Sequence, residues 1–263
     1  MARRWRPVLA AYRMVSQLID PQLLYAGLRG YPRYLQDFLR YRRLTTSSGQ
    51  KPAMEWMPAL RERTLSTTFD AHYCYMSHWA TKGIVARFAA SGAARHVDVG
   101  SQIAWLMPLA ALLPVETVDI RPYETCLPWL TVRAGSILSL PYADRSIASL
   151  SCLHVVEHIG LGRYGDPLSA TGSVDAMREL ARVLAGGGSL HFAVPCGRPR
   201  VCFNAHRVFD PLQIVSAFEQ WGLHLETFSA VTDERRYLEP ARPEVLVDAD
   251  YGCGMFHFRR DER

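Results

Sequence analysis

The sequence predicts an α/β fold with a doubly wound, mostly parallel sheet, and three segments carry this prediction. One apolar run ends in an acid and a glycine (Asp98-Val99-Gly100), and a second ends in Asp119. A third apolar run leads into His154-Val155-Val156-Glu157-His158. Acids and small residues at strand ends, repeated at βα spacing, form a nucleotide-type cofactor crevice at the carboxyl edge of a parallel sheet.

The apolar runs predict seven strands in a Rossmann-like sheet, and the segments between them predict helices. Strands are expected near residues 95–99, 115–119, 132–136, 146–152, 188–194, 223–229 and 252–258. Helices are expected near residues 102–112, 123–130, 173–184 and 210–220, with a further helical stretch from 54 to 90. Gly186-Gly187-Gly188 after Arg182-Val183-Leu184 marks a helix end that leads into a strand.

Length and composition suit one α/β domain with an appendage. Of the 263 residues, 49% are hydrophobic and 21% are charged, which is ample for a sizeable core. We divide the chain into a basic amphipathic helical extension, residues 1–50, and the α/β domain, residues 51–263. No run approaches the ~18 apolar residues of a membrane span. The six cysteines form no C-x-x-C pair, which favours reduced thiols and a cytoplasmic protein.

The positive charge is concentrated at the N-terminus. Residues 1–43 hold nine arginines and two acids, a charge of +7, so the remainder of this +5 chain carries −2. A nucleic-acid enzyme needs positive charge along its groove, and the mildly acidic body therefore disfavours nucleic acid as a partner.

The N-terminal extension has helical spacing of apolar residues. Trp5, Val8, Tyr12 and Val15 follow one stripe, and further amphipathic pieces cover about 21–29 and 32–44. Basic amphipathic helices with Trp and Tyr at the apolar edge suit an anionic membrane surface, here the inner face of a membrane. The same pattern suits a protein partner or a cap packed on the α/β domain, so residues 1–44 have these three interpretations.

The order of these features resembles the class I S-adenosylmethionine (SAM) methyltransferases over about residues 78–258. The resemblance implies that SAM is the cofactor, that Asp119 accepts the ribose hydroxyls, and that Ser136 and Ile137 contact the adenine. It places the remaining cofactor contacts at Asp98, Gly100, Ser101 and Leu153. Gln102 and Ala104 stand where the family pattern has its later glycines.

Two longer phrases are similar to a narrower group, an uncharacterised methyltransferase-like family of bacterial surface-polysaccharide biosynthesis. They are the segment from Cys152 to Pro167 and Phe203-Asn204-Ala205-His206-Arg207. This resemblance implies a glycan or other polyhydroxyl acceptor.

His154, Glu157 and His158 have i, i+3, i+4 spacing, which places them on one face of a helix after the fourth strand. His206 follows the fifth strand and is expected to reach the same crevice. The set resembles the E-x-x-E-H motif and later histidine of metal-dependent O-methyltransferases. One interpretation is a divalent metal held by His154, Glu157, His158 and His206. A second is metal-free catalysis with His158 or His206 as general base beside Glu157, and a third is a purely structural role.

The segment from Gly160 to Pro167 has three glycines around charged and aromatic residues. One interpretation is a loop that closes over substrate, with Arg163, Tyr164 and Asp166 contacting the acceptor together with Asn204. The other is a solvated connection.

Together these patterns predict a SAM-dependent O-methyltransferase that acts on a saccharide or polyhydroxyl acceptor. The alternative from another class is a catalytically degenerate methyltransferase fold that serves as a scaffold in a glycan-biosynthesis complex. Gln102 and Ala104 favour that alternative, whereas four ionisable groups near one crevice disfavour it.

Overall fold

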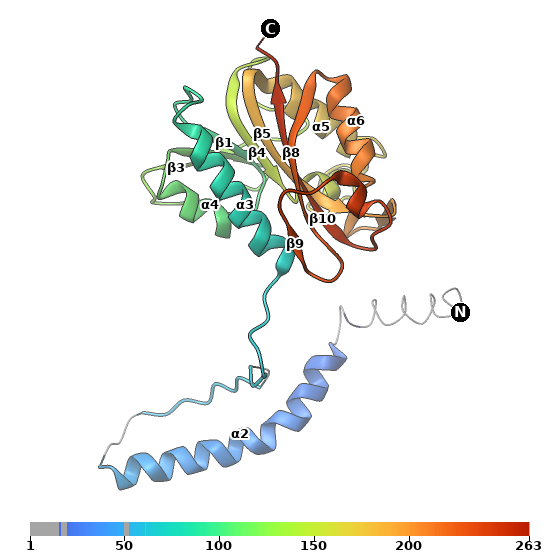
Figure 1. The fold of residues 1–263 in the computed structure, drawn as a ribbon. Helices are drawn as coiled ribbons and strands as arrows, with labels where there is room; N and C mark the ends of the chain where they lie inside the picture. Colours follow the sequence, from blue (N-terminus) through green and yellow to red (C-terminus); the bar gives the residue numbers. More distant parts are fainter. Residues whose placement is uncertain (1–15, 17–19, 50–52, 61, 263) are drawn as a thin grey trace, which may run out of the picture. The chain divides into compact units, whose positions relative to one another are not determined.

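The computed structural model describes residues 16, 20–49, 53–60 and 62–262, which form two compact units, residues 1–68 and 69–263 (Figure 1). The predicted helix over residues 5–19 lies outside the described residues, apart from Ser16. The domain boundary at residue 50 stays a prediction.

The first unit is built on one long helix, α2, which runs from Pro21 to Ser47 and continues through Pro32. It joins the two amphipathic pieces that the sequence suggested. The chain after it is not helical between residues 62 and 69, and Phe38 stacks on Trp56 with ring centroids 4.7 Å apart. The helical stretch predicted over 54–90 therefore begins only in the second unit, with α3 (Ala71–Phe88).

The second unit is built around an eight-stranded sheet, not the seven-stranded sheet that the apolar runs predicted. Its strands are β1 (His96–Val99), β2 (Val115–Asp119), β3 (Leu130–Ala134), β4 (Ile147–Leu153), β5 (Leu184–Cys196), β8 (Leu223–Val231), β9 (Tyr237–Leu238) and β10 (Gly252–Arg260). The order across the sheet is β3-β2-β1-β4-β5-β10-β8-β9. The additional strand, β9, has two residues, too few to give a pattern in the sequence.

Strands β3, β2, β1, β4 and β5 pair in parallel, and β10 inserts antiparallel between β5 and β8. The chain order reverses between β1 and β4, which is where open α/β sheets bind their ligands. A separate two-stranded ribbon, β6 (Arg200–Cys202) and β7 (His206–Val208), follows β5.

Helices cover both faces of the sheet, as a doubly wound fold requires (Figure 1). On one face, α3 and α4 (Ile103–Ala110) bury Trp79, Leu106 and Leu109. On the other, α5 (Gly172–Val183) and α6 (Pro211–Gln220) bury Leu180 and Phe218. These two apolar layers hold the carboxyl ends of the parallel strands in fixed positions.

One predicted helix, over residues 123–130, is absent from the described chain, which has no regular secondary structure there and ends in a turn before β3. Pro122 and Pro128 bracket this stretch, and proline disfavours the helical conformation of the residue before it. Short 3₁₀ turns occur at Val156–His158 (η1) and Pro243–Leu246 (η2).

Candidate functional site

A cavity of about 880 Å³ lies at the carboxyl edge of the sheet. Its walls come from the loop after β1, the residues after β2, the η1 turn and the start of α3. The segment after β8 and the residues just before β10 also line the cavity, with Asp233 in the first and Tyr251 in the second. Strands that are distant in sequence thus contribute to one polar cavity.

The loop after β1 needs a glycine at one position. Gly100 has a φ of +67°, which L side chains rarely adopt, and a Cβ there would lie 3.0 Å from Cγ1 of Val155. Gln102 has an ordinary extended backbone (φ −63°, ψ 129°), and Ala104 lies inside α4. The two positions where the family pattern has further glycines therefore do not require glycine for their backbone conformation.

Asp98 lies beneath the β1 loop and does not line the cavity. Its buried carboxyl accepts hydrogen bonds from the Ser101 backbone, the hydroxyls of Ser101 and Ser151 (both 2.6 Å), and Thr117. Thr117 and Ser151 are its partners in register on β2 and β4. Burial raises the pKa of Asp98 to about 6, although these hydrogen bonds act in the opposite direction and lower it. Asp98 thus fixes the loop rather than presenting an acid to a ligand.

Ser101 and Leu153 are tied to the same network. The Ser101 hydroxyl accepts the Leu153 N–H at 3.0 Å and lies at the cavity wall, whereas the Leu153 side chain is fully buried. Of the cofactor contacts predicted around the β1 loop, only Gly100 and Ser101 therefore face the cavity.

A second, smaller cavity of about 120 Å³ adjoins the first. Gly100 and Asp119 line both cavities, and Ser136, Ile137 and Leu138 line only the smaller one. The Asp119 carboxylate accepts the Arg121 N–H at 2.7 Å, which orients it at the end of β2. The residues predicted for ribose and adenine thus surround one partly apolar space beside the glycine turn.

His154, Glu157 and His158 do not share a helix face, which corrects the predicted geometry. His154 has a φ of +55° and precedes η1, so it points away from the direction a helix would give it. Its Nδ1 lies 2.8 Å from Oε1 of Glu157, and Nε2 of His158 lies 3.8 Å from the same oxygen. Burial lowers the pKa of His154, but the sulfur of Cys253 and the Glu157 carboxylate raise it to about 10.

The two ring nitrogens of His158 differ: Nδ1 is hydrogen-bonded to the backbone, and Nε2 can accept a proton. Nδ1 lies 2.6 Å from the Ala205 carbonyl, which can only accept, so Nδ1 carries the proton. Arg163 donates to the same carbonyl at 2.8 Å, and its 3.2 Å approach to Nδ1 is therefore not a hydrogen bond. The unprotonated Nε2 is then the basic atom. Burial lowers the pKa of His158, which keeps it neutral near pH 7.

His206, at the start of β7, lines the larger cavity, with its ring 5.1 Å from that of Tyr251. Burial lowers its pKa as well. Asn204, predicted to contact substrate, is exposed in the turn between β6 and β7 and lines neither cavity.

The segment from Gly160 to Pro167 is internally bonded. Asp166 accepts the N–H groups of Gly160 (2.7 Å) and Tyr164 (3.2 Å), so it shapes the loop. The Arg121 guanidinium stacks on the Tyr164 ring at 4.2 Å, and Arg163 lies 5.2 Å from that ring. The loop therefore presents Tyr164 and Arg163 to the larger cavity, whereas Asp166 lines only the smaller one.

Among the residues of the larger cavity that were missed from sequence are His72, Tyr73 and Tyr251. His72 and Tyr73 lie in the first turn of α3, and Tyr251 precedes β10. Asp70 caps α3 by accepting the Tyr73 N–H, and an acid directly before a helical apolar pattern is a recognisable start signal. That signal could have predicted where α3 starts. Nothing in the sequence, however, indicated that this start faces the end of β4.

Comparison with solved structures supports this architecture. The chain is similar to the [4+2]-cyclase SpnF, with a TM-score of 0.54 and 15% identity over 83% of this chain and 91% of that one. It is also similar to a proposed sarcosine dimethylglycine methyltransferase from Galdieria sulphuraria, with a TM-score of 0.51 and 14% identity over 72% and 86%. This is the class I methyltransferase fold. At these identities the likeness establishes the fold alone.

The family model described as "Caenorhabditis protein of unknown function, DUF268" matches residues 142–247. No curated protein matches the sequence at a significant level. The predicted tie to surface-polysaccharide biosynthesis has no support from these matches. In the part of the chain that the structure describes, no helix is long and apolar enough to cross a bilayer.

Proposed function

We propose that the protein is a SAM-dependent O-methyltransferase that acts on a hydroxyl of a saccharide or other polyhydroxyl acceptor. The observation that supports it best is the pair of adjoining cavities. The smaller, partly apolar one is bordered by Gly100, Asp119 and Ile137, and the larger, polar one contains His158.

The residues present fit a nucleoside. A Cβ at position 100 would crowd Val155, so this turn leaves room for close backbone approach. The Asp119 carboxylate is held by the Arg121 N–H and is suited to accept ribose hydroxyls. Ile137, Leu138 and Val155 offer apolar surface for a purine. When bound, SAM supplies a methyl group on a sulfonium sulfur as the electrophile.

His158 would then activate the acceptor. As the acceptor oxygen forms its bond to the methyl carbon and the sulfur–carbon bond breaks, the hydroxyl proton passes to Nε2 of His158. The Ala205 carbonyl holds the ring in the required tautomer through Nδ1. Glu157, 3.8 Å from Nε2, stabilises the imidazolium that results.

The larger cavity suits a polyhydroxyl acceptor because its lining combines aromatic rings with acids. Tyr73 and Tyr251 offer flat faces, and Asp70, Asp233 and Asp250 offer acceptors for hydroxyl groups. Arg163 and Arg235 add donors on the same walls.

The fold alone does not decide the chemistry, since one similar structure is titled a cyclase. The proposal is tested by calorimetric titration of the full chain with S-adenosylhomocysteine. We expect micromolar binding, and Asp119→Asn should weaken it by about 10–150-fold, because a hydrogen bond to a charged group contributes about 1.5–3 kcal/mol.

The matched control is Asp175→Asn, a partly exposed acid of α5 that lines neither cavity and should leave binding unchanged. Failure of the folded protein to bind S-adenosylhomocysteine would overturn the proposal and favour the scaffold alternative.

We also propose that α2 docks on an anionic membrane surface. Leu24, Leu28, Tyr31, Leu35 and Leu39 follow helical spacing, and all of them are exposed. Arginines such as Arg29, Arg33 and Arg40 supply the positive charge that anionic lipid attracts. The full chain should sediment with vesicles rich in phosphatidylserine and not with neutral vesicles, and Leu28→Glu should reduce sedimentation. Equal sedimentation of wild type and variant would contradict the proposal.

A further inference from the structure

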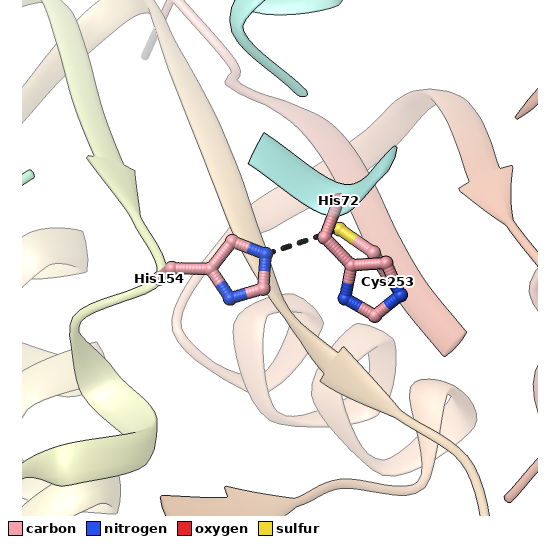
Figure 2. A group of neighbouring side chains, drawn as sticks. All are labelled: His72, His154 and Cys253. Carbon is pink, nitrogen blue, oxygen red and sulfur yellow. Dashed lines mark hydrogen bonds between the residues drawn. The ribbon is translucent and has the colours of Figure 1, made fainter. Parts of the chain in front are cut away.

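Three side chains of the kinds that can bind a metal ion, from distant parts of the chain, lie together beside the larger cavity. His72 comes from the first turn of α3, His154 from the end of β4, and Cys253 from the start of β10 (Figure 2). One nitrogen or sulfur from each lies within 4.8 Å of the others. It is the one group of this kind among the described residues, and it shares only His154 with the predicted metal ligands.

We propose that His72, His154 and Cys253 bind a zinc ion, with a fourth coordination position open to the larger cavity. Two imidazoles and a thiolate form a ligand set that binds zinc in preference to magnesium or calcium. Three protein ligands with one open position is the arrangement of catalytic rather than structural zinc.

The spacing of the donors fits tetrahedral coordination. Nε2 of His154 lies 3.3 Å from Sγ of Cys253. The dashed line in Figure 2 marks this contact. Zinc–nitrogen and zinc–sulfur bonds of standard length place two such donors about 3.5 Å apart at a tetrahedral angle. An ion therefore fits between these two residues without moving β4 or β10, and the His72 donor lies within 4.8 Å of both.

The groups behind the ligands are those that metal sites use to orient histidines. Nδ1 of His154 donates to Glu157 at 2.8 Å, which directs the other nitrogen toward Cys253. His72 interacts with the backbone of Tyr251 and stacks on its ring at 5.1 Å. Metal-binding histidines nearly always donate their second N–H to a carboxylate or a carbonyl.

Glu157, which orients His154, also has one oxygen without a partner among the described residues, on the side of the cavity. It is 1% exposed, lines the larger cavity, and its Oε2 has no hydrogen-bond partner within the described chain. A buried carboxylate oxygen left unpaired is costly. Because Glu157 lines the larger cavity, a hydroxyl or a water molecule bound in that cavity can supply the missing donor. The left-handed backbone of His154 (φ +55°) is the kind of strain that concentrates at functional sites.

The order Cys253, His154, Glu157 is also that of a nucleophilic triad. The thiol is fully buried, however, and does not line the cavity, whereas His72 and His154 do. A substrate carbonyl cannot approach that sulfur, but an ion seated between the rings can bind it from the cavity side. The geometry therefore favours coordination over covalent catalysis.

An ion at this position would polarise the acceptor hydroxyl that His158 deprotonates, and this role rests on the proposed methyl transfer. Metal binding itself does not depend on it. The test therefore uses the full chain, stripped with chelator, and two separate titrations: one with Zn²⁺ or Co²⁺, and one with S-adenosylhomocysteine.

We expect one equivalent of zinc per chain by elemental analysis, and Co²⁺ should produce the near-ultraviolet absorption of a cobalt–thiolate bond. Cys253→Ser should abolish that absorption, and His72→Ala should abolish stoichiometric binding. Glu157→Gln should weaken zinc binding by about 10–100-fold, as expected for a residue that orients a ligand.

The matched controls are Cys196→Ser, a buried thiol of β5, and His78→Ala, an exposed histidine of α3, and both should bind zinc as the wild type does. If the Cys253→Ser variant does not fold, the His72→Ala variant still tests the proposal, because His72 is only partly buried. Absence of stoichiometric zinc, or binding that both His72→Ala and Cys253→Ser leave intact, would overturn the metal site. S-adenosylhomocysteine binding to the stripped protein would survive that result, so the two proposals fail separately.

Discussion

Asp98 allows a quantitative prediction, because its carboxyl group is fully buried beneath the cavity loop. Burial raises its pKa from 3.8 to about 6. The folded state then binds this proton more tightly than the unfolded state does, so stability decreases as the pH rises through this range. A shift of about 2 pKa units corresponds to about 3 kcal/mol, and the wild type should lose that much unfolding free energy between about pH 4 and about pH 7.

The variant Asp98→Asn isolates this effect, because the amide does not titrate. We would measure urea unfolding of the wild type and the variant at several pH values and follow the difference between them. Other titrating groups cancel in that difference as long as the substitution leaves them undisturbed. The variant should gain about 3 kcal/mol relative to the wild type as the pH rises from about 4 to about 7.

A difference that does not change with pH would refute the reasoning. It would mean that the hydrogen bonds from Ser101, Thr117 and Ser151 stabilise the carboxylate as fully as water does.

Three further predictions concern the glycine turn at Gly100, the general base His158 and the hydrogen bonds of Arg182. Gly100→Ala should lower stability by about 1–2 kcal/mol, because φ is +67° and Val155 is close, and unchanged thermal unfolding would contradict this. His158→Gln should lower kcat by about 10²–10⁴-fold in a methyl-transfer assay and leave S-adenosylhomocysteine affinity intact, and an equal loss of binding would argue for a structural role. Because burial lowers the pKa of His158, the wild-type rate should decrease on the acid side only below the ordinary histidine pKa. Arg182→Ala removes hydrogen bonds to two carboxylates and two carbonyls and should lower the free energy of urea unfolding by about 1–3 kcal/mol. Lys82→Met, which removes one exposed ion pair, should lower it by under about 1 kcal/mol, and equal losses would contradict the stabilising role of Arg182.

Local patterns were sufficient to predict the parallel half of the sheet. The segments that end at Val99, Asp119 and Leu153 are buried along most of their length because parallel strands are covered on both faces. Gly100, Asp119, Ser136 and Ile137 were grouped correctly in space because each follows a parallel strand, and such strands end at one edge.

The site was harder to predict where side-chain direction or long-range contact decides it. The i, i+3, i+4 spacing after β4 assumed a helix, but His154 adopts a left-handed backbone and bonds Glu157 within a tight turn. Asp98 had the right position for a ligand contact, yet its partners on β2 and β4 turn it inward.

Cys253 had the appearance of an ordinary core residue in an apolar strand. Its closeness to His154 follows from the insertion of β10 beside β5, which local sequence does not encode. Its two flanking glycines gave no indication of a ligand.

The insertion of β10 has a consequence for the order in which the molecule can be made. Strand β8 cannot pair with β5 directly, because β10 lies between them and follows both in the chain. During synthesis the final pairing along β5 is therefore reached only after β10 has emerged from the ribosome. Cys253 belongs to that strand, so the three-residue cluster, unlike the glycine turn and Asp119, becomes complete only after β10 has been synthesised.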